Sequence, residues 1–186
     1  MKLQTVFSRD ELVAFASQWL PLKLQLGDPK KDDRYLLLSD PKTIDLVPER
    51  GLRIACRAQI RWPVLGMNVP ITARNLSVLM TPSVVEVDGQ PALAFKPRIE
   101  QAELTGVPKQ LDGTLTEAVN RALADRVKPT WPFGATFTRS IPMPALLSTT
   151  ASIDLSVAGG EVHVSEEAFT FSVIVRASAP RRSAVE

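Results

Sequence analysis

Few residues of this chain have the types and spacing that catalysis needs. Its 186 residues include one histidine, His163, and one cysteine, Cys56. A serine–histidine–acid arrangement could therefore use only His163, and a single cysteine allows neither an internal disulfide nor a zinc site built on cysteines. Motifs of the types G-x-S-x-G, G-x-G-x-x-G and H-E-x-x-H and the phosphate loop are absent from the sequence. We expect no enzymatic activity, no cofactor and no metal site.

The reactive side chains that remain have simpler interpretations. His163 stands between two valines in a strand-like segment, which predicts that it faces away from the core. Cys56 lies on the apolar face of an alternating segment, where burial disfavours the reactive thiolate. The carboxylate pairs Asp32-Asp33 and Glu166-Glu167 stand in turn-like segments and should be solvated.

Three arginines share one face of the most regular strand-like segment, Leu52–Trp62. Arg53, Arg57 and Arg61 recur at even spacing, so neighbouring members should lie roughly 13–14 Å apart on the same side of the strand. Such a basic face can meet anionic lipid headgroups at a membrane surface, or an acidic partner. Alternatively, it is an outer sheet face on which arginine stems cover apolar surface, and this interpretation is favoured. The net charge of +2 does not indicate a nucleic-acid partner.

Aromatic and methionine side chains gather at the ends of predicted elements and in proline-bounded loops. Core packing explains most of them, but flexible and aromatic side chains are also typical of the mouth of an apolar pocket. The Trp131-Pro132-Phe133-Gly134 stretch is where we expect an entrance or a lid. The candidate ligand-binding residues are Trp62, Met67, Leu115, Val119, Leu123, Trp131, Phe133 and Phe137.

The elements that must position these residues include one clear helix within 107–144. Its start is marked by Asp112 or by Thr114, the latter forming a capping box with Glu117. Pro129 and Pro132 should end it. Its apolar residues recur at three- and four-residue spacing and form one stripe, which must lie on a sheet: Leu111, Leu115, Ala118, Val119, Ala122 and Leu123.

Most of the remaining chain alternates in the manner of antiparallel strands. A shorter helix is predicted for about 9–20, where Ser8 and Glu11 form a second capping box. The apolar phase slips near Arg74-Asn75, which predicts a bulge, and Asp88-Gly89 predicts a tight hairpin turn. The segments Asp40-Pro41, Pro82 and Lys96-Pro97 predict strand breaks. The fold class expected is α+β, with a highly curved antiparallel sheet wrapped around a long helix and a short N-terminal helix.

This order of elements resembles the tubular lipid-binding (TULIP) superfamily and, more narrowly, small bacterial YceB-like lipoproteins of uncharacterised function. The stretches that carry the resemblance are SRDELVAFASQWLP, LRIACRAQIRW, ALAFKPRIEQAELTGVP, LDGTLTEAVNRALADRV, WPFG and IPMP. The resemblance implies a single domain over residues 1–178, with an apolar tunnel or groove beside the helix, and leaves a disordered tail over 179–186. The N-terminal lipobox cysteine of those lipoproteins is absent here.

The function predicted is non-enzymatic binding of a lipid or other apolar or amphipathic small molecule in a groove between helix and sheet. The alternative is a structural or protein-interaction module with a filled core and no ligand. The first residues, MKLQTVFSRDEL, lack the apolar core of a secretory signal. The protein is therefore expected in the cytoplasm if this N-terminus is native, and in the periplasm or at a membrane if a signal was removed.

Overall fold

Long antiparallel strands make up most of the molecule. The computed structural model describes residues 1–26, 28, 34–64, 67–106, 108–126, 129–142 and 152–178. Along the chain the elements are β1 (Lys2–Ser8), α1 (Arg9–Trp19), β2 (Leu22–Gln25), β3 (Tyr35–Val47), β4 (Gly51–Val64), β5 (Met67–Val87), β6 (Gln90–Thr105), α2 (Lys109–Arg126), β7 (Thr130–Trp131), α3 (Phe133–Phe137), β8 (Arg139–Pro142), β9 (Ser152–Val164) and β10 (Ala168–Ser178).

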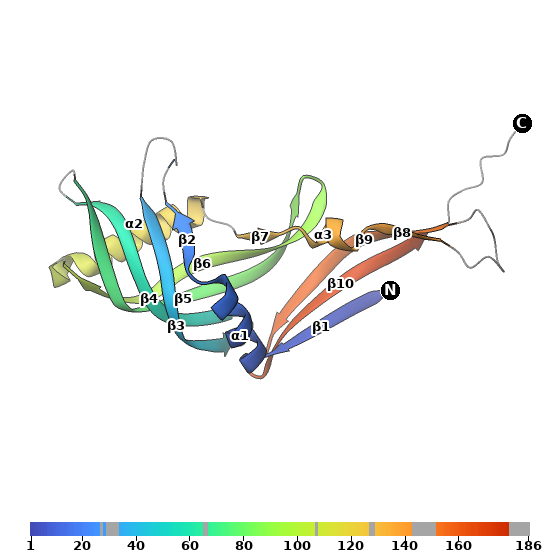
Figure 1. Ribbon diagram of the computed structural model, residues 1–186, viewed down its shortest axis with the longest axis horizontal. Coiled ribbons are helices and arrows are strands. Elements are labelled where there is room, and N and C mark those ends of the chain that lie inside the picture. Colours follow the sequence, from blue (N-terminus) through green and yellow to red (C-terminus); the bar gives the residue numbers. More distant parts are fainter. Residues whose placement is uncertain are drawn as a thin grey trace, which may run out of the picture.

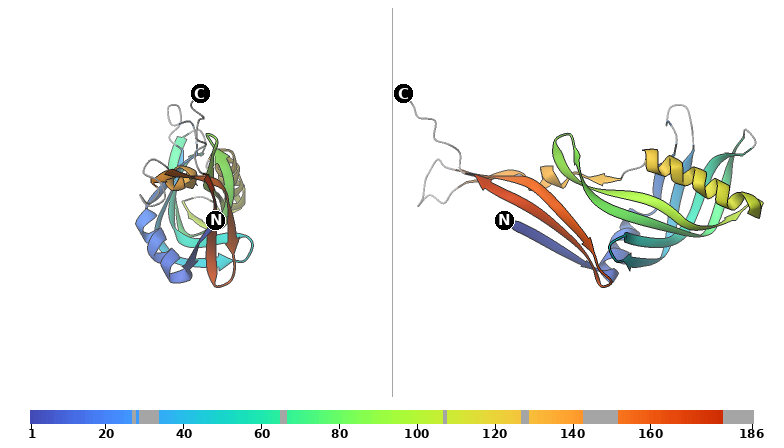
Figure 2. Two further views of the ribbon diagram at one scale, coloured as in Figure 1. Left: turned by 90° about the vertical axis from the view of Figure 1, so that its right-hand side faces the viewer. Right: turned by 180° about the vertical axis from the view of Figure 1, so that it is seen from behind.

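The strands form two sheets, which extend in different directions from the region of α1 (Figures 1 and 2). The four-stranded sheet has the order β1-β10-β9-β8, and the six-stranded sheet has the order β2-β3-β4-β5-β6-β7. The chain therefore begins and ends in the four-stranded sheet, because β1 pairs with β10. The predicted tail, 179–186, lies outside the described residues.

The predicted α+β fold, with one curved sheet wrapped around a long helix, is wrong. Strand accounts for 68% of the structure and helix for 19%, and the strands form two sheets instead of one. The helices α1, α2 and α3 have 11, 18 and 5 residues, whereas β5 alone has 21. The architecture is therefore mostly β, with short helices packed on the sheets.

Prolines inside strands caused much of this error. The predicted breaks at Asp40-Pro41, Pro82 and Lys96-Pro97 lie within β3, β5 and β6. Pro82 follows Met80, the last residue of β5 that pairs with β4, and Pro97 lies where β6 has a strand on one side only. Pro41 lies at a register shift. Proline costs no sheet hydrogen bond at such positions, so the short predicted strands join into long ones.

A row of irregularities bends the six-stranded sheet. The predicted bulge at Arg74-Asn75 is confirmed, because these two residues of β5 lie opposite single residues of β4 and of β6, Arg57 and Glu103. In β3 the pairing shifts near Pro41, next to Asp40, whose φ is 47°. Bulges bend a strand and increase its twist, so this sheet curls where they line up.

Two local predictions, one at the start of α1 and one at a hairpin turn, are confirmed. Ser8 donates from its backbone N and from Oγ to the Glu11 carboxylate, at 2.7 and 2.8 Å, which is the predicted capping box. These bonds, the backbone one first, lower the pKa of Glu11. Asp88 and Gly89 both have positive φ, 52° and 72°, as a two-residue hairpin turn between β5 and β6 requires. The strand β1 before Ser8 was not predicted.

The apolar stripe of α2 is buried as predicted. Leu115, Val119 and Leu123 belong to the main core cluster, while the side chain of Leu111 lies outside the described residues. The helix begins at Lys109, so neither Asp112 nor Thr114 caps it. None of the described helices has the length and apolar character needed to cross a bilayer.

Asn120 fixes α2 to the edge of β6. Its Oδ1 accepts a hydrogen bond from the backbone N of Ile99 at 2.7 Å, and its Nδ2 donates to the carbonyl of Ile99 at 2.9 Å. β7 pairs with β6 only at Leu93 and Ala94, so Ile99 has no strand beside it on the side away from β5. The side-chain amide therefore takes the place of a neighbouring strand.

Substituting Asn120 by alanine should lower the free energy of unfolding by about 1–3 kcal/mol, because it leaves an N–H and a C=O of Ile99 without their partner. Urea denaturation measures this loss. Glu117→Ala, one turn earlier on the exposed side of α2, is the matched control and should change stability by no more than about 0.5 kcal/mol. Equal losses in the two variants would contradict the role given to Asn120.

Candidate functional site

A pocket of about 450 Å³ lies between the two sheets, beside α1. Both sheets contribute to it, from β1 and β10 on one side and from β4, β6 and β7 on the other. Eight of its nine lining residues are apolar, and the ninth is a threonine: Phe7, Leu12, Leu52, Leu93, Phe95, Thr130, Trp131, Phe169 and Phe171. No charged side chain lines this pocket among the described residues.

One wall of the pocket is an aromatic cluster held by α3. Phe133 is fully buried and meets Phe171 edge to face, with ring centroids 4.9 Å apart. Trp131 packs on both rings, at 5.8 Å from Phe171 and 6.2 Å from Phe133. A Cβ at Gly160 would lie 2.8 Å from Cζ of Phe133, so glycine at this position allows α3 to approach β9. The cluster therefore fixes Trp131 at the pocket while 41% of that residue stays exposed.

The opposite part of the wall joins the first and last strands to β6. The ring of Phe169 lies 6.2 Å from that of Phe7 and 6.4 Å from that of Phe95. Phe95 donates its backbone N–H to the carbonyl of Pro129 at 2.9 Å. The next two residues in the chain, Thr130 and Trp131, form β7 and pair with Ala94 and Leu93 of β6. The backbone thus places Thr130 and Trp131 at the pocket.

The residues predicted to bind a ligand lie in different parts of the structure. Trp131 lines the pocket, and Phe133 supports it from behind. The stripe residues Leu115, Val119 and Leu123 are buried in the core, so they fill the space where a groove between helix and sheet was predicted. Phe137 and Trp62 do not line the pocket. Phe137 packs partly buried against the core, and Trp62 lies under the Arg34 guanidinium at 5.0 Å. The Met67 side chain lies outside the described residues.

Most of the pocket lining was not predicted from the sequence. Phe169 and Phe171 alternate along one strand, as Leu93 and Phe95 do, so each pair can be recognised as sharing one face. The residues around Phe7 in the sequence do not indicate that it lies beside Phe169, because that contact depends on the long-range pairing of β1 with β10. The long-range pairing of strands was the missing information.

The predicted basic face carries its charges largely in ion pairs. Arg53 donates from Nε to Glu100 at 2.7 Å, and Arg50 binds the other oxygen of the same carboxylate at 2.9 Å. Arg57 lies 3.6 Å from Asp40, and Arg61 is partly buried. Acidic partners therefore compensate Arg53 and Arg57, and the face is not a free stripe of positive charge.

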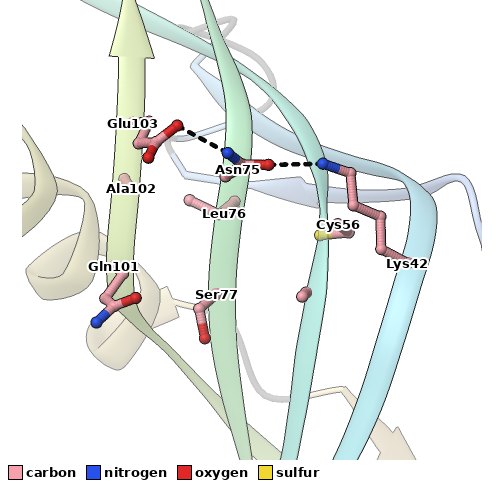
Figure 3. A pocket seen from close by; sticks show the side chains of 9 residues that line it. Lys42, Cys56, Asn75, Leu76, Ser77, Gln101, Ala102 and Glu103 are labelled. Carbon is pink, nitrogen blue, oxygen red and sulfur yellow. Dashed lines mark hydrogen bonds between the residues drawn. The ribbon is translucent and has the colours of Figure 1, made fainter.

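A second, polar pocket of about 410 Å³ lies at the row of bulges (Figure 3). Lys42 of β3 reaches across β4 and donates to Oδ1 of Asn75 at 2.6 Å, and Nδ2 of Asn75 donates to Glu103 at 2.7 Å. The asparagine thus links a cation to an anion. Cys56 also lines this pocket, but burial raises the pKa of its thiol to about 11, despite the opposing effect of Lys42. The thiol is therefore protonated at neutral pH.

The other candidate reactive groups are in solvent. His163 is exposed on β9, as predicted, and Glu166 and Glu167 are exposed on the bend that follows. The Asp32-Asp33 pair lies outside the described residues. The apolar pocket between the sheets is therefore the candidate ligand site.

Comparison with known proteins does not assign a family. No protein-family model and no curated protein matches the chain. Among solved structures it is similar to one described as a crystal structure of lipopolysaccharide binding protein, with 11% identity and a TM-score of 0.41. The match covers 98% of this chain and 52% of that one, so the chain spans about half the length of that structure. A TM-score this low assigns neither fold nor family.

The ion pairs of Glu100 should make stability depend on pH. The hydrogen bond from Arg53, followed by other contacts with Arg53 and Arg50, lowers the pKa of Glu100 from its ordinary value of 4.5. A carboxylate whose pKa is lower in the folded state contributes stability above the unfolded pKa, and this contribution is lost as the pH falls through the folded pKa. We therefore expect Glu100→Gln to be less stable than the wild type at neutral pH, with the difference shrinking below about pH 4.5.

Urea denaturation across a pH series measures this difference. Glu166→Gln, on an exposed bend, controls for the removal of one negative charge. A Glu100→Gln deficit that stays constant from neutral to acidic pH would show that the carboxylate does not act through these arginines.

Proposed function

We propose that this protein binds a lipid, or another apolar or amphipathic small molecule, in the pocket between its two sheets, and that it catalyses no reaction. The observation that supports this most directly is the lining, which is apolar at every position except Thr130. A volume of about 450 Å³ falls within the range of roughly 300–1,000 Å³ that is usual for small-molecule pockets. The ligand class is also the one that the resemblance to the TULIP superfamily implies.

Removal of apolar surface from water would supply the affinity. Each buried methylene contributes about 0.8 kcal/mol, and part of this is offset by the lost freedom of the ligand. An acyl chain in this pocket needs no specific polar contact to bind. Thr130, at the exposed margin, and the indole N–H of Trp131 are the lining groups that can hydrogen-bond to a polar end of the ligand.

The filled-core alternative, an interaction module without a ligand, fits the space beneath α2 better than the space between the sheets. Leu115, Val119 and Leu123 are packed where the groove was predicted, but the hollow beside Trp131 has no such side chain in it. The ligand proposal therefore concerns the contact between the sheets and not the helix.

Trp131→Ala should weaken the binding of cis-parinaric acid by about tenfold or more, equivalent to about 1.4 kcal/mol, because it removes the largest side chain of the pocket wall. The measurement is a fluorescence titration, with displacement by unlabelled palmitate. Trp62→Ala is the matched control, since Trp62 is also a partly exposed tryptophan on a strand but does not line the pocket.

A variant that fills the pocket tests the same site from the other direction. Thr130→Trp should occupy the hollow and abolish uptake, whereas Thr130→Val should keep it. Absence of uptake by the wild type, or equal weakening by Trp131→Ala and Trp62→Ala, would rule out this pocket as the ligand site.

A further inference from the structure

One edge of the four-stranded sheet is long and open. β1 forms this edge and pairs with β10 in an unbroken register from Lys2 to Ser8. Met1 and Val175 exchange two hydrogen bonds of 2.8 Å, since each donates from its nitrogen to the carbonyl of the other. Hydrogen-bonded pairs alternate with non-hydrogen-bonded pairs along an antiparallel ladder. The alternate residues of β1 therefore direct their peptide groups away from β10.

The outward groups can be assigned from this register. Leu3, Thr5 and Phe7 follow Met1 in steps of two, so their N–H and C=O groups bond to β10. The N–H and C=O groups of Lys2, Gln4 and Val6 point to the open edge. In Figures 1 and 2 no other element lies along that side of β1.

Exposed apolar side chains gather at the same edge. Eight large hydrophobic residues are exposed in the described chain, and four of them are on β1, just before it, or on the adjacent strand: Met1, Leu3, Val6 and Ile174. A strand edge that also exposes apolar side chains is a typical site for pairing with another chain.

The other outermost strands of the two sheets are shorter than β1. β2 and β8 have four residues each and β7 has two, and beyond β7 the edge of β6 is covered by α2 through Asn120. By contrast, β1 has seven residues and no proline. Its one charged side chain, Lys2, is held by Glu161 at 2.6 Å, so β1 lacks the free charges that commonly block edge pairing.

We propose that β1 is the interface of a homodimer, in which β1 of a second copy pairs with it in antiparallel orientation. A two-fold axis at Gln4 places Lys2 opposite the partner's Val6, so no lysine faces another lysine and the edge is complementary to itself. The three outward residues then form about six hydrogen bonds across the axis. The two four-stranded sheets join into one continuous sheet, and each copy keeps its Phe7 beside its own pocket.

Sedimentation of the wild-type protein over a concentration series tests this proposal. We expect the mass to rise from that of a monomer to twice that value. Val6→Lys should weaken the association at least about tenfold, because it places a lysine opposite the partner's Lys2 and like charges directly opposite are unfavourable. Thr170→Lys is the matched control, since Thr170 is the β10 neighbour of Val6 on the same face but lies away from the edge, and it should leave the association unchanged.

Hydrogen exchange gives a second, register-specific measurement. On dimerisation the amides of Gln4 and Val6 should become protected, while those of Leu3, Thr5 and Phe7 are protected at every concentration. A wild type that stays monomeric throughout overturns the proposal, even if a strand of another protein binds this edge. Equal weakening by the two lysine variants, or a dimer whose Gln4 and Val6 amides still exchange rapidly, overturns it as well.

Discussion

Long strands have long edges, and the backbone N–H and C=O groups along those edges need hydrogen-bond partners. This need constrains the whole structure. Where β6 extends beyond the two-residue strand β7, the side-chain amide of Asn120 bonds both the N–H and the C=O of Ile99. This contact determines where α2 lies and hence which space its apolar stripe fills. Within the six-stranded sheet, the row of bulges near Pro41 and Arg74-Asn75 bends the long strands.

Two apolar interiors of different character result from this arrangement. Beneath α2, the stripe residues Leu115, Val119 and Leu123 are packed against the six-stranded sheet. Between the sheets, the aromatic side chains meet at ring separations of 4.9 to 6.4 Å but leave a hollow beside Trp131. Protein interiors are otherwise close-packed, so packing is incomplete at the contact between the sheets.

Local patterns predicted local structure well. The alternation of Leu52–Trp62, the Ser8–Glu11 capping box and the slip at Arg74-Asn75 each depend on neighbouring residues, and each is confirmed. Prolines were misinterpreted because their cost depends on whether a strand lies on the side of the missing N–H, which a single segment does not reveal. The pairing of β1 with β10 was missed for the same reason. Among the predicted ligand-binding residues whose side chains the structure describes, Trp131 alone lines the pocket.

The location of the pocket couples ligand binding to the contact between the sheets. That contact includes the hydrogen bond from the Glu49 backbone N–H to the carbonyl of Val164, 2.9 Å long, and the packing of Trp131 of β7 on Phe171 of β10, with ring centroids 5.8 Å apart. A molecule that fills the hollow touches residues of both sheets, for example Leu93 and Phe169. Because it binds only when the sheets are docked, its binding free energy adds to the stability of that docked arrangement. A ligand in this pocket would therefore stabilise the docked arrangement of the two sheets.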